Sequence, residues 1–270
     1  MSPSLAAIVI YPVKSCAGLA LQSAVVEPRG LRHDRRWMLV DDSGRFITGR
    51  QSPSLVRVRA EVGDAGSLRL RAPGMLPLQV AEPDGSQRVD SEVWGSEVNA
   101  ADAGAEAADW FSRYLGRTVR LLFADEQMRR APEAEYSLPG DQVGFADGYP
   151  LLLLSFAAAE LLSSRAGREL GWRRFRPNLV IDGVAAHAED RWKQIRIGSV
   201  LFDVVKPCTR CVFTTIDPDS GAAESDGEPL RTLKDYRRGA GGIRFGQNLI
   251  ARSAGEVQCG DRVEVIEQML

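Results

Sequence analysis

Leu-Arg-Leu-Arg at residues 68–71 and Leu-Val-Arg-Val-Arg-Ala at residues 55–60 alternate apolar and basic side chains. Because successive side chains of a strand point to opposite faces of a sheet, this alternation predicts strands with one buried face. Working outward, residues 5–10 form a short apolar run, and residues 37–40 and 45–48 flank an Asp-Asp-Ser-Gly turn that predicts a hairpin. Short strands separated by turn residues are typical of a small barrel or sandwich.

The rest of the chain is also predicted to form short strands, with helices between some of them. Further strands are expected at residues 151–155, 178–181, 195–197, 200–205, 211–216 and 257–266. Helices are expected at residues 103–115, 156–166 and 228–237. The polar loop at residues 125–148 is long for a bare connection, which favours a functional or mobile role. The predicted fold class is mainly β, a β-rich α+β fold.

Composition excludes several classes of protein. The 270 residues carry 34 Lys and Arg against 36 Asp and Glu, and a formal net charge of −2 argues against nucleic acid as a partner. Four cysteines are too few for a disulfide framework and indicate a reducing compartment. The longest apolar stretch, residues 149–162, is shorter than the roughly 20 residues that span a bilayer. We expect a cytoplasmic protein without a targeting segment and without a membrane partner.

The histidines offer little for metal chemistry. Only two are present, His33 and His187, which argues against a multi-histidine metal site. His187 has no partner at ligand spacing, so we expect an ordinary surface or core histidine.

The sharpest local motif is Cys-Thr-Arg-Cys at residues 208–211, and four interpretations are open. A structural zinc needs two more ligands, but the remaining cysteines and histidines are scattered. A redox dithiol is favoured where the pair begins a helix, whereas residues 211–216 are expected to form a strand. A lone thiolate ligand to a cofactor metal would have Arg210 beside it, which favours ionised sulfur. Two buried cysteines without chemistry remain the plain alternative.

Three further motifs place cations beside aromatic or chain-reversing residues: Tyr-Pro-Val-Lys-Ser-Cys at 11–16, Asp-Arg-Arg-Trp at 34–37 and Phe-Arg-Pro-Asn at 175–178. Each cation taken alone is best explained as a solvated surface charge. Taken together with the arginine of the cysteine motif, they could cradle an anion, because Arg forks match phosphate geometry and Lys adds a point charge. We therefore predict that Lys14, Arg35, Arg176 and Arg210 converge on one cleft.

In their order along the chain, these motifs resemble the MOSC family, named for the C-terminal domain of molybdenum cofactor sulfurases. The motifs at 11–16 and 34–37, with residues 30–32 and Thr-Gly-Arg-Gln at 48–51, resemble its N-terminal β-barrel. Residues 175–178, 208–211, 214–219, 228–230 and 245–248 resemble its MOSC domain. The resemblance covers nearly the whole chain. It implies an N-terminal barrel-like domain at 1–120 packed on a MOSC β-barrel with a few helices at 121–270.

The resemblance implies a molybdenum cofactor, Mo-molybdopterin, and assigns roles residue by residue. Cys211 matches the family's molybdenum ligand and is the implied catalytic residue. The matching cofactor-binding positions are Lys14, Ser15, Arg35, Gly148, Tyr149, Arg176, Asn178, Thr209, Arg210 and Asn248. At Gly148, Tyr149 and Asn248 the side chains differ from those of mitochondrial relatives, so backbone roles are implied there. Pyridoxal phosphate binding is implied only as a family-level term.

The relatives it resembles most reduce N-hydroxylated compounds, and they include the mitochondrial amidoxime-reducing component. This implies a molybdenum-dependent reductase of small amidoxime or hydroxylamine-type substrates. Certain bacterial members carry a C-terminal iron–sulfur domain with four cysteines, which this sequence lacks. Electrons are therefore expected from a separate electron-transfer protein of iron–sulfur, flavin or cytochrome type. The alternative is a non-catalytic cofactor or sulfur carrier that uses a persulfide on Cys211.

Overall fold

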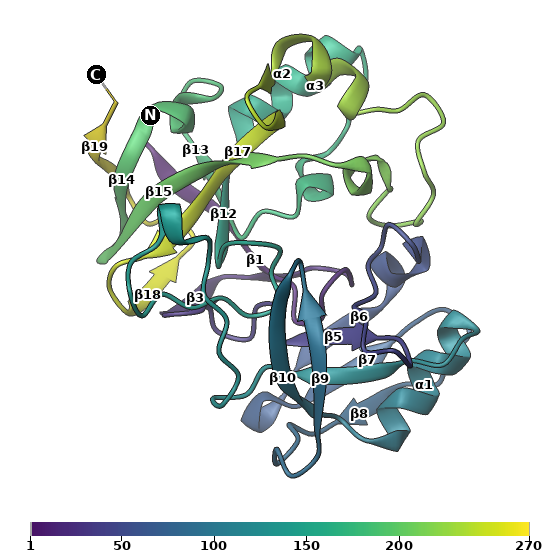
Figure 1. The fold of residues 1–270 in the computed structure, drawn as a ribbon. Coiled ribbons are helices and arrows are strands. Elements are labelled where there is room, and N and C mark those ends of the chain that lie inside the picture. Colours follow the sequence, from purple (N-terminus) through teal and green to yellow (C-terminus); the bar gives the residue numbers. More distant parts are fainter. Residues whose placement is uncertain (1, 270) are drawn as a thin grey trace.

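The computed structural model describes residues 2–269, which form two β-rich bodies stacked one above the other in Figure 1. Within these residues, three α-helices accompany four sheets. The prediction of a mainly β fold with a few helices is confirmed.

A nine-stranded sheet forms the upper body. In spatial order its strands are β19 (Val263–Gln268), β14 (Trp192–Ile197), β15 (Val200–Thr209), β17 (Gly242–Ala251), β12 (Leu151–Ser155), β13 (Leu179–Asp182), β1 (Ser4–Ile10) and β2 (Leu19–Leu21), with β16 (Arg238–Gly239) paired to β17. Helices α2 (Phe156–Ala166) and α3 (Leu230–Tyr236) lie at its top in Figure 1. Leu153 packs into the sheet's inner core and Leu154 packs with these helices. Both faces of β12 are therefore buried, which explains its unbroken apolar run.

Three smaller sheets complete the structure. Their strands are β5 (Trp37–Val40), β11 (Arg120–Phe123), β10 (Ser96–Asp102) and β9 (Arg88–Val93); β6 (Arg59–Val62), β7 (Leu68–Arg71) and β8 (Leu78–Val80); and β18 (Gly255–Gln258), β3 (Ser23–Glu27) and β4 (Gly30–Leu31). Helix α1 (Ala105–Leu115) presents Ala107, Trp110 and Phe111 to the lower core at helical spacing. The predicted helix at 103–115 is confirmed with a slightly later start.

Strand pairing crosses the predicted division at residue 120. Strand β1 pairs antiparallel with β13, so the first strand of the chain lies in the sheet built by the second half. The division into 1–120 and 121–270 stays a prediction. The crossing matters for the site, because the segment that leaves β1 carries Lys14 and Ser15 into the space between the two bodies.

Three predicted strands are wrong in form. Residues Pro53–Arg57 form a 3₁₀ helix, because the proline favours a helical first turn and the neighbours Leu55 and Val56 are both buried. Residues Val212–Thr215 also form a 3₁₀ helix. The Cys211 carbonyl accepts hydrogen bonds from Thr214 N at 3.1 Å and from its Oγ1 at 2.9 Å, which closes the turn. The predicted strand at 257–266 is two strands, β18 and β19, separated by a turn.

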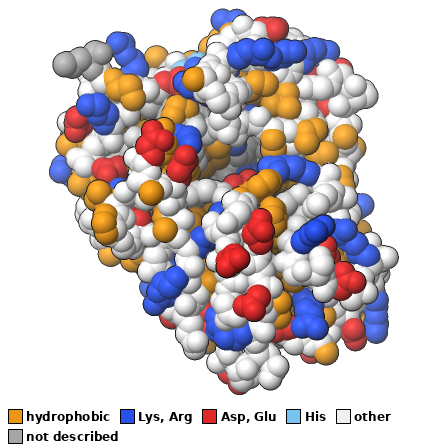
Figure 2. Space-filling model, in the orientation of Figure 1, with side chains coloured by type: hydrophobic (Ala, Val, Ile, Leu, Met, Phe, Trp, Pro, Cys, Tyr) orange, Lys and Arg blue, Asp and Glu red, His pale blue; other side chains and the backbone are white. Residues whose placement is uncertain are grey.

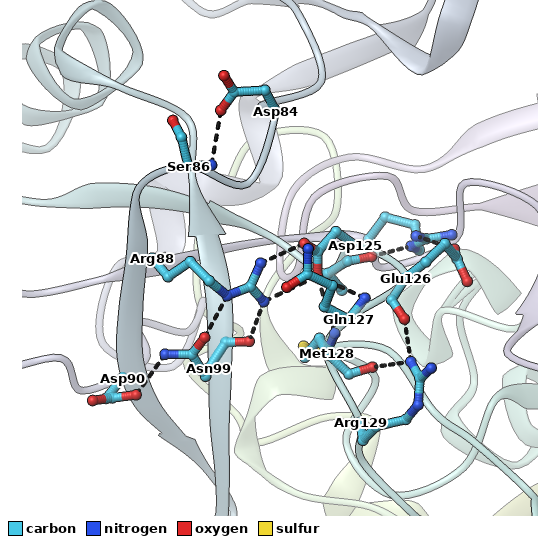
Figure 3. Close-up of polar contacts among 12 residues, drawn as sticks. Asp84, Ser86, Arg88, Asp90, Asn99, Asp125, Glu126, Gln127, Met128 and Arg129 are labelled. Carbon is cyan, nitrogen blue, oxygen red and sulfur yellow. Dashed lines mark hydrogen bonds and ion pairs between the residues drawn. The ribbon is translucent and has the colours of Figure 1, made fainter.

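The β9–β10 hairpin is fixed at its base, as Figure 3 shows. The Arg88 guanidinium donates to both carboxylate oxygens of Asp125, at 2.5 and 3.1 Å, and to the Asn99 carbonyl at 2.8 Å. The hydrogen bond from Arg88 holds the pKa of Asp125 below its usual range. The hairpin therefore has a defined direction, and its tip points toward the upper body (Figure 1).

Replacing Gly246 by alanine should lower the free energy of unfolding by about 2 to 4 kcal/mol. Its φ is +77°, and an added Cβ would lie 2.6 Å from the Leu153 carbonyl oxygen of the neighbouring strand. Chemical denaturation measures the loss. The matched control is Gly148→Ala, where a Cβ would have no heavy atom within 4 Å, and its effect should stay within about 1 kcal/mol. Equal losses in both variants would contradict this explanation.

Candidate active site

A cleft of about 560 Å³ lies between the two bodies, and Figure 2 shows a hollow near the middle of the molecule. All eleven residues predicted for the site line this cleft: Lys14, Ser15, Arg35, Gly148, Tyr149, Arg176, Asn178, Thr209, Arg210, Cys211 and Asn248. The four cations predicted to converge are among them. Their role in cofactor binding stays a prediction, but the geometry that this role requires is present.

Strained backbone conformations are concentrated at the cleft. Seven residues other than glycine have positive φ in the described chain, and four of them, Ser15, Arg35, Trp94 and Arg176, line the cleft. Such conformations cost free energy and persist where the surroundings enforce them, as they do at functional sites. The cleft is therefore distinguished by its backbone as well as by its charge.

Lys14 and Asp147 form an ion pair among the residues that line the cleft. Lys14 Nζ lies 2.5 Å from Asp147 Oδ1 and donates to the Phe145 carbonyl at 2.7 Å. Burial lowers the pKa of Lys14, although the Asp147 carboxylate opposes this. Burial acts to raise the pKa of Asp147, but the Lys14 ammonium outweighs it and holds that pKa well below its usual range. Each partner's charge therefore opposes the effect of burial on the pKa of the other.

Arg35 and Asn178 act as a clamp between two turns. Arg35 Nη1 donates to Asp34 Oδ2 at 2.7 Å and to Asn178 Oδ1 at 2.8 Å, while Nη2 donates to the Arg176 carbonyl at 3.1 Å. Burial works to lower the pKa of Arg35, but the Asp34 carboxylate raises it overall. The clamp fixes the backbone around Arg176 in the left-handed region that its φ of +55° requires.

Of the cations that line the cleft, Arg176 and Arg210 are the two that form no ion pair with a carboxylate of the described residues. Arg176 donates to the Cys16 carbonyl at 2.7 Å, and Arg210 donates to the Phe245 and Phe175 carbonyls at 2.8 and 3.0 Å. In both side chains Nη2 is buried without a hydrogen-bond partner within residues 2–269. Burial lowers the pKa of Arg176 to about 10, which still leaves it charged at neutral pH. Arg174, which also lines the cleft, likewise has Nη1 buried without a partner in the described chain, so three guanidinium groups are unsatisfied there, which fits an anionic ligand such as a phosphate.

The charges of the residues that line the cleft also favour an anionic ligand. Seven of its lining residues are cations, and among residues 2–269 Asp147 is the only carboxylate in the lining. The cations are Lys14, Arg35, Arg50, Arg174, Arg176, Lys206 and Arg210. A chain with a net charge of −2 thus concentrates positive charge where an anion would bind.

The two cysteines of the motif differ in their surroundings. Arg50 Nε lies 3.2 Å from Cys211 Sγ, so a cationic donor contacts this sulfur. Burial raises the pKa of the Cys208 thiol, which favours its neutral form. Cys211 precedes a 3₁₀ helix, so the expectation that residues 211–216 form a strand is wrong at this cysteine. Within residues 2–269 no group of three or more His, Cys, Asp and Glu side chains is arranged to hold a metal ion.

The other predicted positions contribute in different ways. Tyr149 donates to Glu133 Oε2 at 3.1 Å, and burial together with that carboxylate raises its pKa above the usual range. Lys206 Nζ lies 2.5 Å from the same carboxylate oxygen. The hydroxyl of Tyr149 is therefore used for local structure, consistent with a backbone role at this position. Gly148, Thr209 and Asn248 line the cleft directly.

Sequence reasoning missed Arg50, Trp94 and Asp147. The motif at residues 48–51 contains Arg50, but its sequence alone indicates no role for this cation. Trp94 Nε1 donates to Asp147 Oδ1 at 3.1 Å, and the Arg50 guanidinium lies 4.6 Å from the Trp94 ring centroid. No local pattern marks Trp94 or Asp147, because they are distant in the sequence and only the fold brings them together.

His187 lies outside the cleft, as expected for an ordinary histidine. It contacts Tyr236 and Phe245, and neither of its ring nitrogens has a hydrogen-bond partner within the described chain. Burial lowers its pKa to about 4 from the usual 6.5. The unfolded chain therefore binds more protons between these values, so stability falls as the pH drops through that range.

We expect this histidine to account for about 1 to 2 kcal/mol of stability lost between pH 6.5 and 4, less than the full shift because the ring is partly exposed. His187→Asn is the comparison variant, since asparagine tolerates the left-handed φ of +63° at this position. Urea unfolding of both proteins across this pH range measures the difference. Parallel pH profiles would show that another group is responsible.

The fold and the cleft define a class: a two-body β protein with a cationic cleft and one thiol in contact with a cationic donor. Comparison with known proteins agrees. The MOSC N-terminal beta barrel domain matches residues 2–118 and the MOSC domain matches residues 140–264. The chain belongs to the MOSC family, within the group that contains the amidoxime-reducing components.

The relatives are similar over most of their length. Mitochondrial amidoxime-reducing component 1 of Mus musculus is 36% identical over 98% of this chain and 83% of its own. Mitochondrial amidoxime reducing component 2 of Bos taurus is 37% identical over 84% of this chain and 70% of its own. The crystal structure of the YUAD protein from Bacillus subtilis covers 97% of this chain and 94% of its own, with 11% identity and a TM-score of 0.45. No helix among residues 2–269 is both long and apolar enough to cross a membrane.

Proposed function

We propose that this protein is a molybdenum cofactor-dependent reductase of N-hydroxylated compounds of the amidoxime or hydroxylamine type. The single observation that carries the proposal is the cleft itself: Arg176 and Arg210 each leave a buried guanidinium nitrogen unsatisfied there, on the same cleft as the Cys211 thiol. The similarity to amidoxime-reducing components supports the reaction type.

The residues of the cleft suit the two chemical parts of such a cofactor. The phosphate would be held by Arg176 and Arg210, because charge-assisted hydrogen bonds are the strong ones. Cys211 would provide the one protein ligand to the metal, as a thiolate. When bound, the group supplies two-electron oxygen-atom chemistry, which protein side chains do not provide on their own.

The protein's side chains would bind and orient the cofactor and adjust its electrostatic surroundings. Arg50 places positive charge beside the Cys211 sulfur at 3.2 Å. The Arg35–Asn178 clamp holds the turn that presents Arg176. Lys14 and Asp147 form an ion pair in which the lysine side chain is 5% exposed, so its amino group is held in the cleft lining with little water around it.

Electrons would come from a separate electron-transfer protein, and we propose a cytoplasmic setting. The test is metal and pterin analysis of freshly purified protein, followed by reduction of an amidoxime with a chemical electron donor. Near-stoichiometric molybdenum, pterin fluorescence and amidine formation are the expected results. Sulfane sulfur on Cys211 in metal-free protein, with no reduction, would support the carrier function instead.

A further inference from the structure

Trp94 occupies a turn position that disfavours it. Val93 pairs with Ser96, so Trp94 and Gly95 form a two-residue hairpin loop. Their φ values of +51° and +82° are both positive, as a type I′ turn requires. Asparagine and glycine are preferred at such positions, and a bulky side chain there is an outlier. An outlier of this kind calls for a function that the side chain serves.

The indole lies at the cleft. Its Nε1 donates to Asp147, on the loop that precedes β12, at 3.1 Å, and its ring stacks against the Arg50 guanidinium at 4.6 Å. The Phe46 ring supports it at 4.9 Å between centroids. The base of the hairpin is fixed by Arg88 and Asp125 (Figure 3), and this contact restricts the position of the tip.

Arg50 depends on this ring for its position. Its other contacts are the Cys211 sulfur at 3.2 Å and a long ion pair with Asp147 at 3.8 Å. Its side chain is 29% exposed, and an exposed ion pair at that distance orders a long side chain poorly. A stacked aromatic face restricts the guanidinium plane far more.

We propose that Trp94 is a positioning residue: its indole holds the Arg50 guanidinium against the sulfur of Cys211. The sequence keeps tryptophan in an unfavourable turn because the site needs its ring. The consequence for catalysis rests on the proposed function, since it assumes that Cys211 is the metal ligand. The placement of Arg50 does not depend on that assumption.

The decisive variant is Trp94→Asn, which separates turn stability from positioning. Asn-Gly suits a type I′ turn, so Tm should stay unchanged or rise by about 1 to 3 °C. In metal-free full-length protein, the side-chain Nε–H resonance of Arg50, assigned through its loss in Arg50→Lys, should shift and broaden. In protein loaded with the cofactor, kcat for amidoxime reduction should fall roughly 10- to 100-fold, with a smaller change in KM.

Trp94→Phe is the rescue variant, because it keeps an aromatic face for Arg50 while it loses the hydrogen bond to Asp147. It should restore most of the Arg50 resonance and of kcat. An Arg50 resonance that is unchanged in Trp94→Asn overturns the proposal, as does an unchanged kcat. If the resonance responds as expected but the wild-type protein binds molybdenum and reduces no N-hydroxylated compound, the proposed function fails while the positioning of Arg50 stands.

Discussion

Cys211→Ala should reduce the molybdenum content of the purified protein to background and abolish amidoxime reduction. Cys211 is the cleft thiol that a cationic side chain contacts, through Arg50 Nε at 3.2 Å. A metal bound here would have no other cluster of protein ligands among the described residues to hold it. Loss of the thiolate therefore removes the only protein–metal bond that the proposed site offers.

Cys208→Ala is the matched control, three residues away on the same cleft. It should keep most of the metal and most of the activity, and cost on the order of 1 kcal/mol through lost packing. Elemental analysis of both variants beside the wild type, expressed under the same molybdate supply, makes the comparison. If Cys208→Ala loses the metal and Cys211→Ala keeps it, the ligand assignment is reversed. Retention in both variants would mean that the cysteines are structural.

The backbone elements were predictable where one physical signal dominates. Helix α1 follows from apolar side chains at helical spacing, and β7 from the alternation of Leu68 to Arg71, whose leucines are buried and whose arginines are exposed. Residues 211–216 mislead because β-branched side chains favour strands, whereas the Thr214 hydroxyl and amide instead close a turn on the Cys211 carbonyl. Side-chain hydrogen bonds of this kind are invisible to periodicity.

The features of the site can likewise be divided into those that the sequence predicts and those that depend on the fold. Lys14, Arg35, Arg176 and Arg210 could be proposed from the sequence because each lies in a compact motif beside proline, aromatic or cysteine residues. The sequence could not show which of these cations remain available to bind an anion. Arg35 is engaged by Asp34 and Asn178, while Arg176 donates to a backbone carbonyl and stacks on the Tyr11 ring. That difference depends on carbonyls and carboxylates brought together by the fold.

Arg176→Gln should lower the molybdenum content at least about 10-fold, because one charge-assisted hydrogen bond to a buried anion is worth roughly 1.5 to 3 kcal/mol. Arg176 Nη2 is the buried donor left unsatisfied, and the side chain stacks on Tyr11 at 4.0 Å. Glutamine removes the charge and the guanidinium fork from the cleft. Arg176→Lys should retain an intermediate amount, since it keeps the charge but loses the fork.

Lys206→Gln is the control for charge alone. Lys206 lines the same cleft, but its side chain is 32% exposed and its ammonium is already paired with Glu133. Because an exposed, paired cation contributes little, its removal should change the molybdenum content less than about threefold. Arg176→Gln also loses the hydrogen bond to the Cys16 carbonyl. Thermal unfolding of the metal-free proteins shows whether the variant still folds. A folded Arg176→Gln protein with full molybdenum content would mean that the buried guanidinium serves the fold, and that the anion is held elsewhere in the cleft.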